Sequence, residues 1–187
     1  MTNTRIVSQF LTILALVASA FAVNAAEPPK VGDAAPDFTL NTLDGKTVKL
    51  SQETAKRPVV LVVLRGWPGY QCPICTRQVQ EFTQQADALA GKAQVLMVYP
   101  GPADDLKAHA QEFLKDKQWP EKFLFVTDPD YTFTQSYGLR WDAKGETAYP
   151  STFIIDSKGK IQFAKISKGH GGRSNAAEVV KAMDEIK

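Results

Sequence analysis

Residues 59–77 read VVLVVLRGWPGYQCPICTR, an apolar run followed by a short loop and two cysteines three residues apart. The solid apolar run Val59–Leu64 predicts a central strand that is buried on both faces. A helix is expected from Pro73 to about Ala90, because proline suits the first helical position and apolar residues then recur at helical spacing. The cysteines therefore lie at the carboxyl end of a strand, where ligands bind in open α/β sheets.

The remainder of the chain alternates between strand and helix patterns. Further strands are predicted at 38–40, 47–50, 95–99, 123–126, 152–155 and 161–166, and further helices at about 103–117, at 131–137 and from Asn175 onward. Asp44-Gly45 predicts the turn of an N-terminal hairpin. We expect an α/β fold with a mostly parallel central sheet and one antiparallel edge. An extended lead-in, 26–36, would precede a single domain, 37–187.

The N-terminal residues 1–25 are typical of a secretory signal. Arg5 supplies a positive charge, no acidic residue precedes Glu27, and Phe10–Val23 is almost wholly apolar. That run is shorter than the roughly 20 residues of a membrane-spanning helix. The small residues around Ala25 predict cleavage after it, and the alternative is an uncleaved anchor. We therefore expect an exported protein, periplasmic or secreted, without stable membrane insertion after cleavage.

The composition is that of an ordinary globular protein. Of 187 residues, 44% are hydrophobic and 22% are charged, which excludes a disordered or collagen-like chain. The 22 basic residues face 20 acidic ones without a basic block, so nucleic acid is not an expected partner. Two cysteines are too few to staple a fold, but they are sufficient for redox chemistry.

The two cysteines differ in their expected chemistry. Cys72 is predicted at the N-cap of the helix and Pro73 at its first position, where unpaired N–H groups and the helix dipole favour a thiolate. In such motifs the cysteine pKa falls from about 8.5 to roughly 3.5–7.5. Cys75 lies one turn further along and should be more buried and less ionised, while Cys72 should be exposed. The spacing predicts an attacking thiolate and a resolving thiol.

Three other roles for the cysteine pair are less well supported. A structural disulfide across so short a loop would contribute only about 2 kcal/mol. Zinc would need His109 and His170, which are too far apart in sequence for a standard zinc motif. Haem attachment requires histidine directly after Cys75, where Thr76 stands. We expect neither a metal nor a cofactor.

The order of elements resembles the thioredoxin fold, and the N-terminal hairpin with an inserted βα unit at 123–137 resembles its peroxiredoxin branch. That branch is the alkyl hydroperoxide reductase/thiol-specific antioxidant, or redoxin, family. The similarity rests on VGDAAPDF at 31–38, on the pair Cys72-Pro73, on AYPSTFIID at 148–156 and on Gly172-Arg173-Ser174. The resemblance implies an active-site role for Arg173.

The chain also departs from the peroxiredoxin pattern P-x-x-x-T-x-x-C. Arg65 and Gly69 stand where the proline and the peroxide-binding threonine belong. Pro150 replaces the arginine that typical members carry before the late strand, and a proline there resembles the cis-proline of thioredoxin; the alternative is an ordinary trans-proline at a strand start. The position of Cys75 is also thioredoxin-like. The chain thus combines a peroxiredoxin outline with a thioredoxin-type disulfide.

Several residues near the motif are candidates for supporting roles. Arg65 is a candidate for lowering the pKa of Cys72 and orienting the substrate, the alternative being a surface pair with an acid such as Asp37. Trp67, with Tyr70, is a candidate for an apolar rim that meets a partner. His170, in a glycine-rich loop, is expected to have a local structural role.

Two enzymatic hypotheses follow. In the first, the protein is a thiol-dependent peroxidase in which Cys72 becomes a sulfenic acid and Cys75 then forms a disulfide with it. In the second, it is a thiol–disulfide oxidoreductase that acts on disulfides of exported proteins. Both need a thiol reductant such as a thioredoxin-like protein. A redox-inert binding module is the third hypothesis, but such a protein is expected to have lost a cysteine.

Overall fold

The computed structural model describes residues 26–186, and the predicted signal segment 1–25 lies outside them. The elements are, in chain order, β1 (Thr39–Thr42), β2 (Thr47–Lys49), α1 (Leu50–Thr54), β3 (Val59–Val63), α2 (Pro73–Gln84), α3 (Ala86–Lys92), β4 (Gln94–Gly101), α4 (Leu106–Leu114), β5 (Phe123–Pro129), α5 (Thr132–Ser136), β6 (Ser151–Ile155), β7 (Ile161–Ile166) and α6 (Ala176–Glu185). The α/β prediction is confirmed. No helix within 26–186 is both long and apolar enough to cross a membrane.

The strands form one mixed sheet in the order β2-β1-β5-β4-β3-β6-β7. Only the central strands β3, β4 and β5 are parallel to one another, and every other neighbouring pair is antiparallel. The prediction of a mostly parallel sheet with one antiparallel edge is therefore wrong, because antiparallel strand pairs outnumber parallel ones. The N-terminal hairpin adds a second antiparallel edge, because β1 pairs with the inserted strand β5.

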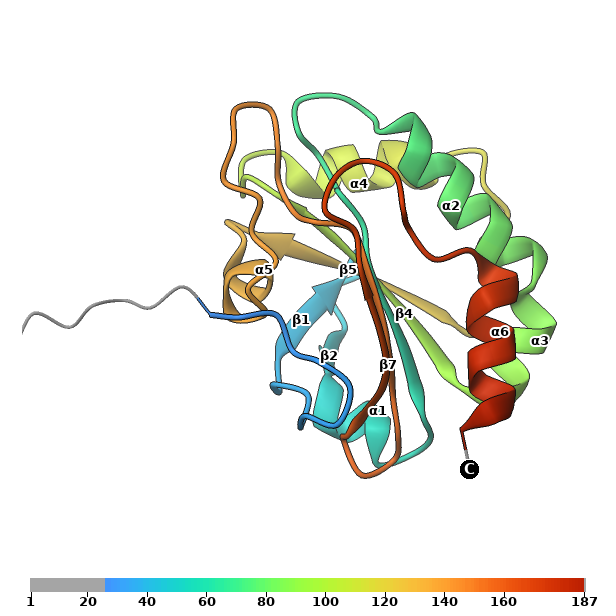
Figure 1. The fold of residues 1–187 in the computed structure, drawn as a ribbon. Coiled ribbons are helices and arrows are strands. Elements are labelled where there is room, and N and C mark those ends of the chain that lie inside the picture. The colour runs from blue at the N-terminus through green and yellow to red at the C-terminus, as the bar shows by residue number, and fades with distance from the viewer. Residues whose placement is uncertain (1–25, 187) are drawn as a thin grey trace, which may run out of the picture.

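Alternate residues of β3 contribute to two hydrophobic cores, one on each face of the sheet. Val60, Val62 and Leu64 pack with residues of α2, α3, α4 and α6, and the cysteines belong to this core. Val59, Leu61 and Val63 face the other side, where α5 covers the sheet. Figure 1 shows the helical layer of α2, α3 and α6 on one side of the strands. The solid apolar run is thus explained by burial on both faces.

Two of the predicted helices differ in extent from the observed ones, and one observed helix was not predicted. The predicted helix 73–90 is divided into α2 and α3 at Gln85, whose φ of −104° and ψ of 20° are not helical. α4 begins only after Asp105, because Asp105 is left-handed and the backbone N–H of Ala103 is bound by Asp130 instead. The short helix α1 was not predicted, since it has too few residues for a periodic pattern.

The segment 26–36 is more than a lead-in to the domain. Gly32 donates its N–H to the carbonyl of Ile161, and the N–H of Ile161 donates in turn to the carbonyl of Asp33. Ala35 donates to the carbonyl of Gly159, at the turn between β6 and β7. These bonds fix the segment to the antiparallel edge of the sheet, so it is part of the folded unit.

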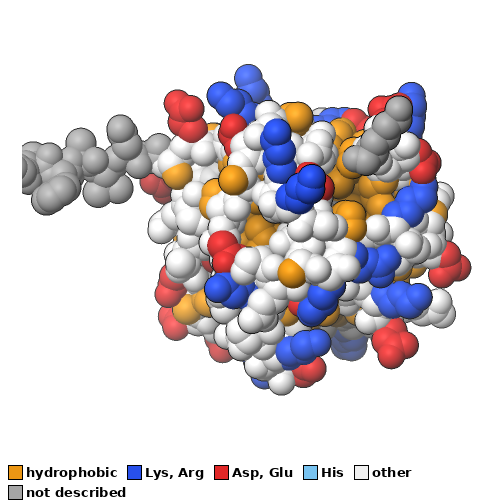
Figure 2. Space-filling model, turned by 90° about the horizontal axis from the view of Figure 1, so that it is seen from below, with side chains coloured by type: hydrophobic (Ala, Val, Ile, Leu, Met, Phe, Trp, Pro, Cys, Tyr) orange, Lys and Arg blue, Asp and Glu red, His pale blue; other side chains and the backbone are white. Residues whose placement is uncertain are grey.

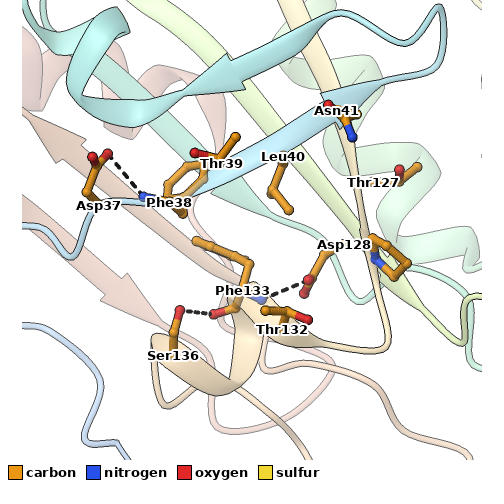
Figure 3. Close-up of a pocket in the computed structure, with 11 residues that line it drawn as sticks. Asp37, Phe38, Thr39, Leu40, Asn41, Thr127, Asp128, Thr132, Phe133 and Ser136 are labelled. Carbon is orange, nitrogen blue, oxygen red and sulfur yellow. Dashed lines mark hydrogen bonds between the residues drawn. The ribbon is translucent and has the colours of Figure 1, made fainter.

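A cavity of about 400 Å³ lies on the α5 face of the sheet (Figure 3). The cysteines belong to the core on the opposite face. The lining of the cavity includes Phe38 and Leu40 at the start of β1 and Phe133 of α5. Buried Asp128 accepts hydrogen bonds from the backbone N–H groups of Phe133 and Thr134, at 2.8 and 3.0 Å. This carboxylate therefore caps α5 and has a structural role.

Charged side chains of both signs are interspersed on the lower end of the molecule, which Figure 2 shows. Hydrophobic side chains appear there only as small areas between them. Among large hydrophobic residues in the described part of the chain, Val31 and Tyr70 are exposed, and Tyr70 lies in the loop before Cys72.

The loop after β3 crosses β4 at very short range, and this contact is testable. Gly66 has a φ of 74°, and a Cβ there would lie 1.9 Å from the carbonyl oxygen of Pro100. Gly45 has a φ of 86° with no atom within 4 Å of such a Cβ, so Gly45→Ala adds only backbone strain, about 1–2 kcal/mol. We expect Gly66→Ala to lower the free energy of unfolding by more, about 3 kcal/mol or above. Urea unfolding measures the difference, and equal losses would contradict the close approach.

Candidate active site

The candidate site lies where three loops meet at one end of the sheet. Residues 65–71 connect β3 to α2, residues 141–149 precede β6, and residues 167–174 connect β7 to α6 (Figure 1). The N-terminus of α2, which carries the cysteines, is at the same end. Side chains from distant parts of the sequence can therefore reach the sulfur atoms.

Cys72 is the N-cap residue of α2, as predicted, with Pro73 at the first helical position. Its Sγ accepts a hydrogen bond from the backbone N–H of Cys75 at 3.3 Å. Both cysteines are free thiols. The prediction that Cys72 is exposed is wrong, because only 3% of its surface is accessible, while Cys75 is fully buried. Burial arises because both cysteines belong to the core beneath α2.

The two thiols have opposite acidities. Hydrogen bonds from the Cys75 side chain and backbone N–H, and the charge of Arg173, lower the pKa of Cys72 to about 5, although burial opposes this shift. Burial and the hydrogen bond to Cys72 raise the pKa of Cys75 well above its usual value. At neutral pH, Cys72 is thus the thiolate and Cys75 the thiol.

Arg173 lies against both sulfur atoms. Its Nη1 is 3.2 Å from Sγ of Cys75, and its Nη2 is 3.9 Å from Sγ of Cys72. Although the guanidinium is nearer to Cys75, the negative charge belongs on Cys72, because that sulfur accepts hydrogen bonds and Cys75 is wholly buried. The structure therefore brings Arg173 to the cysteines, as the resemblance implied.

Gln78 also contacts Arg173, and sequence reasoning missed it. Its side chain is buried, its Oε1 accepts a hydrogen bond from Nη1 of Arg173 at 3.1 Å, and its Nε2 donates to the carbonyl of Ser174 at 3.2 Å. Gln78 is one turn after Cys75 on the same face of α2. A buried glutamine at that spacing was the available signal.

Arg65 does not take part in the sulfur site. It is buried and donates from Nε to Oε2 of Glu146 at 2.6 Å, and its other nitrogens donate to the hydroxyl of Tyr70 and the carbonyl of Gly145. Its Nε, Nη1 and Nη2 are thus each bound away from the sulfurs, and the cation that lowers the pKa of Cys72 is Arg173. The proposed activation of Cys72 is therefore wrong. The alternative, a pair with an acid, is confirmed, but the acid is Glu146 rather than Asp37 and the pair is buried rather than on the surface.

Trp67 and Gln71 pack the loop onto its neighbours. The ring of Trp67 is stacked on that of His109, with centroids 3.7 Å apart, so one face of Trp67 packs against α4. Gln71, not singled out in the sequence, accepts a hydrogen bond from the buried hydroxyl of Tyr99 and donates to the carbonyl of His109. The residue before Cys72 is thereby fixed to β4 and α4. Whether Trp67 meets a partner stays a prediction.

Pro150 is buried at the start of β6, but it is not a cis-proline. No cis peptide bond occurs among residues 26–186, so that prediction is wrong. Tyr149 donates its N–H to the carbonyl of Leu139, and the carbonyl of Pro150 accepts from Ser167. These bonds keep the chain extended into the strand, and proline is compatible with a strand start.

Within residues 26–186, no group of three or more histidine, cysteine or acidic residues is arranged to hold a metal ion. The two histidines have other contacts, His109 with Trp67 and His170 with Glu146. The reactive groups that the structure brings together at this site are two thiols and one guanidinium.

The fold and the paired cysteines define a thioredoxin-fold protein with a dithiol site. The chain belongs to the redoxin family, whose sequence model matches residues 30–180. It is 30% identical over 132 residues to the chloroplastic peroxiredoxin Q of Triticum aestivum, and 31% identical over 137 residues to the putative peroxiredoxin bcp of Coxiella burnetii. Both matches cover 71% of this chain.

The coverage of these relatives differs. The chain spans 57% of the length of the wheat protein and 85% of the Coxiella protein. Among solved structures, it is similar to a peroxiredoxin-like protein from Aquifex aeolicus, with a TM-score of 0.68, 21% identity and coverage of 86% of this chain and 90% of that one. This likeness confirms the fold.

The acidity of Cys72 is directly measurable. In Cys75→Ser, the serine hydroxyl and the same backbone N–H still donate to Cys72, so the thiolate absorbance should titrate with a midpoint near pH 5. In Cys72→Ser, the remaining Cys75 should stay protonated at neutral pH because it is buried. A Cys72 midpoint near that of a free cysteine, about 8.5, would contradict the proposed activation.

The same pKa shift has a consequence for stability. The pKa of Cys72 is lower in the folded protein than in the unfolded chain, so ionisation stabilises the reduced fold. That contribution is complete above about pH 8.5 and is lost as the pH falls through about 5. Comparing the pH dependence of unfolding for the reduced protein and Cys72→Ala tests this sign, and the alanine variant should lack the added slope.

Proposed function

We propose that the protein is a thiol-dependent peroxidase that reduces peroxides through Cys72. The observation that carries this proposal is a buried Cys72 thiolate held between the backbone N–H of Cys75 and the guanidinium of Arg173. Membership of the redoxin family and the similarity to peroxiredoxins support it.

The proposed reaction transfers two electrons from sulfur to peroxide. The Cys72 thiolate attacks the terminal peroxide oxygen, the O–O bond breaks, and the alcohol or water leaves after taking a proton, while Cys72 becomes a sulfenic acid. The Cys75 thiol then attacks this sulfur, a disulfide forms and water is released. A dithiol reductant, such as a thioredoxin-like protein, would reduce the disulfide and be oxidised in its place.

Arg173 is proposed to stabilise the charge that develops on the leaving oxygen. The family threonine that would help bind peroxide is absent, since Gly69 occupies its position. A guanidinium whose Nη2 lies 3.9 Å from the attacking sulfur is well placed to supply the missing hydrogen bond. Because Cys72 is only 3% accessible, the arrangement favours hydrogen peroxide and small hydroperoxides over bulky substrates.

The thiol–disulfide oxidoreductase is the second candidate function. It is favoured by the close spacing of Cys72 and Cys75, whose sulfurs interact directly. It requires a protein disulfide to reach Cys72, which is buried in the reduced protein. That requirement makes the peroxidase the preferred proposal.

Reaction of the reduced protein with hydrogen peroxide separates the two functions. The rate of thiol loss, followed by stopped-flow tryptophan fluorescence and thiol titration, should far exceed that of a free thiol. Arg173→Ala should lower the rate constant about 10²–10³-fold, the usual effect of losing one such donor. Arg57→Ala, which removes a guanidinium that donates to the carbonyl of Gly91, should leave the rate unchanged.

Two outcomes would contradict the peroxidase. One is an Arg173→Ala variant that reacts as fast as the parent. The other is a parent protein that reacts with peroxide no faster than a simple thiol but forms mixed disulfides with protein substrates through Cys72. The second outcome would favour the oxidoreductase.

We also propose that the protein is exported after cleavage of residues 1–25. The charge at Arg5, the apolar run Phe10–Val23 and the small residues before Ala26 support this proposal. The intact mass of the protein purified from its native compartment should correspond to a chain that begins at or within two residues of Ala26. A mass that includes residues 1–25 would instead indicate a retained anchor.

A further inference from the structure

The carboxylate of Glu146 joins two loops that are distant in sequence. Its Oε2 accepts a hydrogen bond from Nε of Arg65 at 2.6 Å, and its Oε1 lies 2.9 Å from Nε2 of His170. The side chain is only 12% exposed. Burial opposes ionisation, but these two contacts lower the pKa of Glu146, so the group is a carboxylate at neutral pH.

The contact with Arg65 anchors Glu146 on the cysteine loop. Arg65 is the first residue after Leu64, and its two remaining nitrogens donate to Tyr70 and to the carbonyl of Gly145, both at 2.6 Å. The hydroxyl of Thr147 also donates to the backbone carbonyl of Arg65. Oε2 of Glu146 is therefore bound to an arginine that is itself held by several hydrogen bonds.

The contact with His170 links Glu146 to Arg173, which lies beside the sulfur atoms. His170 lies among Gly169, Gly171 and Gly172, and glycine leaves the backbone of such a loop with wide freedom. Its carbonyl nevertheless accepts a hydrogen bond from Nε of Arg173 at 3.0 Å. A loop rich in glycine needs outside contacts to hold this carbonyl in place, and the His170 ring supplies one through Glu146.

The guanidinium of Arg173 is thus bound through Nε, and its Nη atoms contact the sulfurs. Nε is bound to the carbonyl of His170 and Nη1 also to Oε1 of Gln78, while Nη1 and Nη2 face the sulfurs of Cys75 and Cys72. Because the guanidinium is planar and rigid, a shift of Nε moves the whole group. The distance from Nη2 to the attacking sulfur, 3.9 Å, therefore depends on where His170 lies.

We propose that Glu146 is a positioning residue that holds Arg173 beside the Cys72 thiolate by fixing His170 against the buried Arg65. The inference rests on the proposed function of Arg173 and extends it. Glu146 itself touches neither sulfur. An alanine there removes both contacts, whereas a glutamine would keep them, with its oxygen accepting from Arg65 and its amide N–H donating to a neutral His170 ring.

A double-mutant cycle in the Cys75→Ser protein tests the proposal. The midpoint of the Cys72 thiolate titration is measured for the parent, Glu146→Ala, Arg173→Ala and the double variant. Glu146→Ala should produce about half or more of the rise in midpoint caused by Arg173→Ala, and the double variant should rise no further than Arg173→Ala alone. An unchanged midpoint in Glu146→Ala, or additive effects, would overturn the proposal.

The titration does not depend on peroxide turnover, so two failures can be told apart. If Arg173→Ala itself leaves the midpoint unchanged, the proposed function of Arg173 fails and this inference with it. If only Glu146→Ala leaves it unchanged, the inference alone fails. Asp37→Asn, which removes a carboxylate bound to Ser51 outside the site, is the matched control and should not move the midpoint.

A second variant covers the case in which Glu146→Ala does not fold. His170→Ala retains the buried pair of Arg65 and Glu146, and the His170 side chain is 45% exposed, so folding should be preserved. It should raise the Cys72 midpoint in the same direction, again without adding to Arg173→Ala. A His170→Ala midpoint equal to that of the parent would overturn the proposal.

Discussion

A negatively charged sulfur inside a protein is the constraint on which this structure depends. Removing a thiolate from water is unfavourable unless hydrogen bonds and an opposite charge replace the solvent. At Cys72 the replacements are the thiol and backbone N–H of Cys75 and the guanidinium of Arg173. The first two come from the start of α2, so the local helix geometry and the acidity of the site have one origin.

The guanidinium, by contrast, must be brought from the far end of the chain. Arg173 follows β7, which the sheet places two strands away from β3. The loops around the site are then linked by polar contacts: Gln78 binds Arg173, and Glu146 binds both Arg65 and His170. The site is therefore a property of three loops packed together, and a change in one loop is expected to reach the others.

The site also shows how the chain combines features of two branches of one fold. The Cys-x-x-Cys spacing is thioredoxin-like, yet the inserted β5–α5 unit and Arg173 are in keeping with a redoxin. Both cysteines are buried, and they lie within one turn of each other at the start of α2. Pro150 does not extend the likeness to thioredoxin, because its peptide bond is trans.

The sequence alone determined the features that depend on neighbouring residues: the buried strand β3, the N-cap at Cys72 and the hairpin around Asp44-Gly45. Their signals lie within one or two turns of backbone. Only the tertiary structure decided the partners of the charged groups, because Arg65 and Glu146 are 81 residues apart and Arg173 and Cys75 are 98 apart. Resemblance pointed to Arg173, but no local pattern distinguishes an arginine that meets a thiolate from one that meets a buried carboxylate; the packing of the loops does.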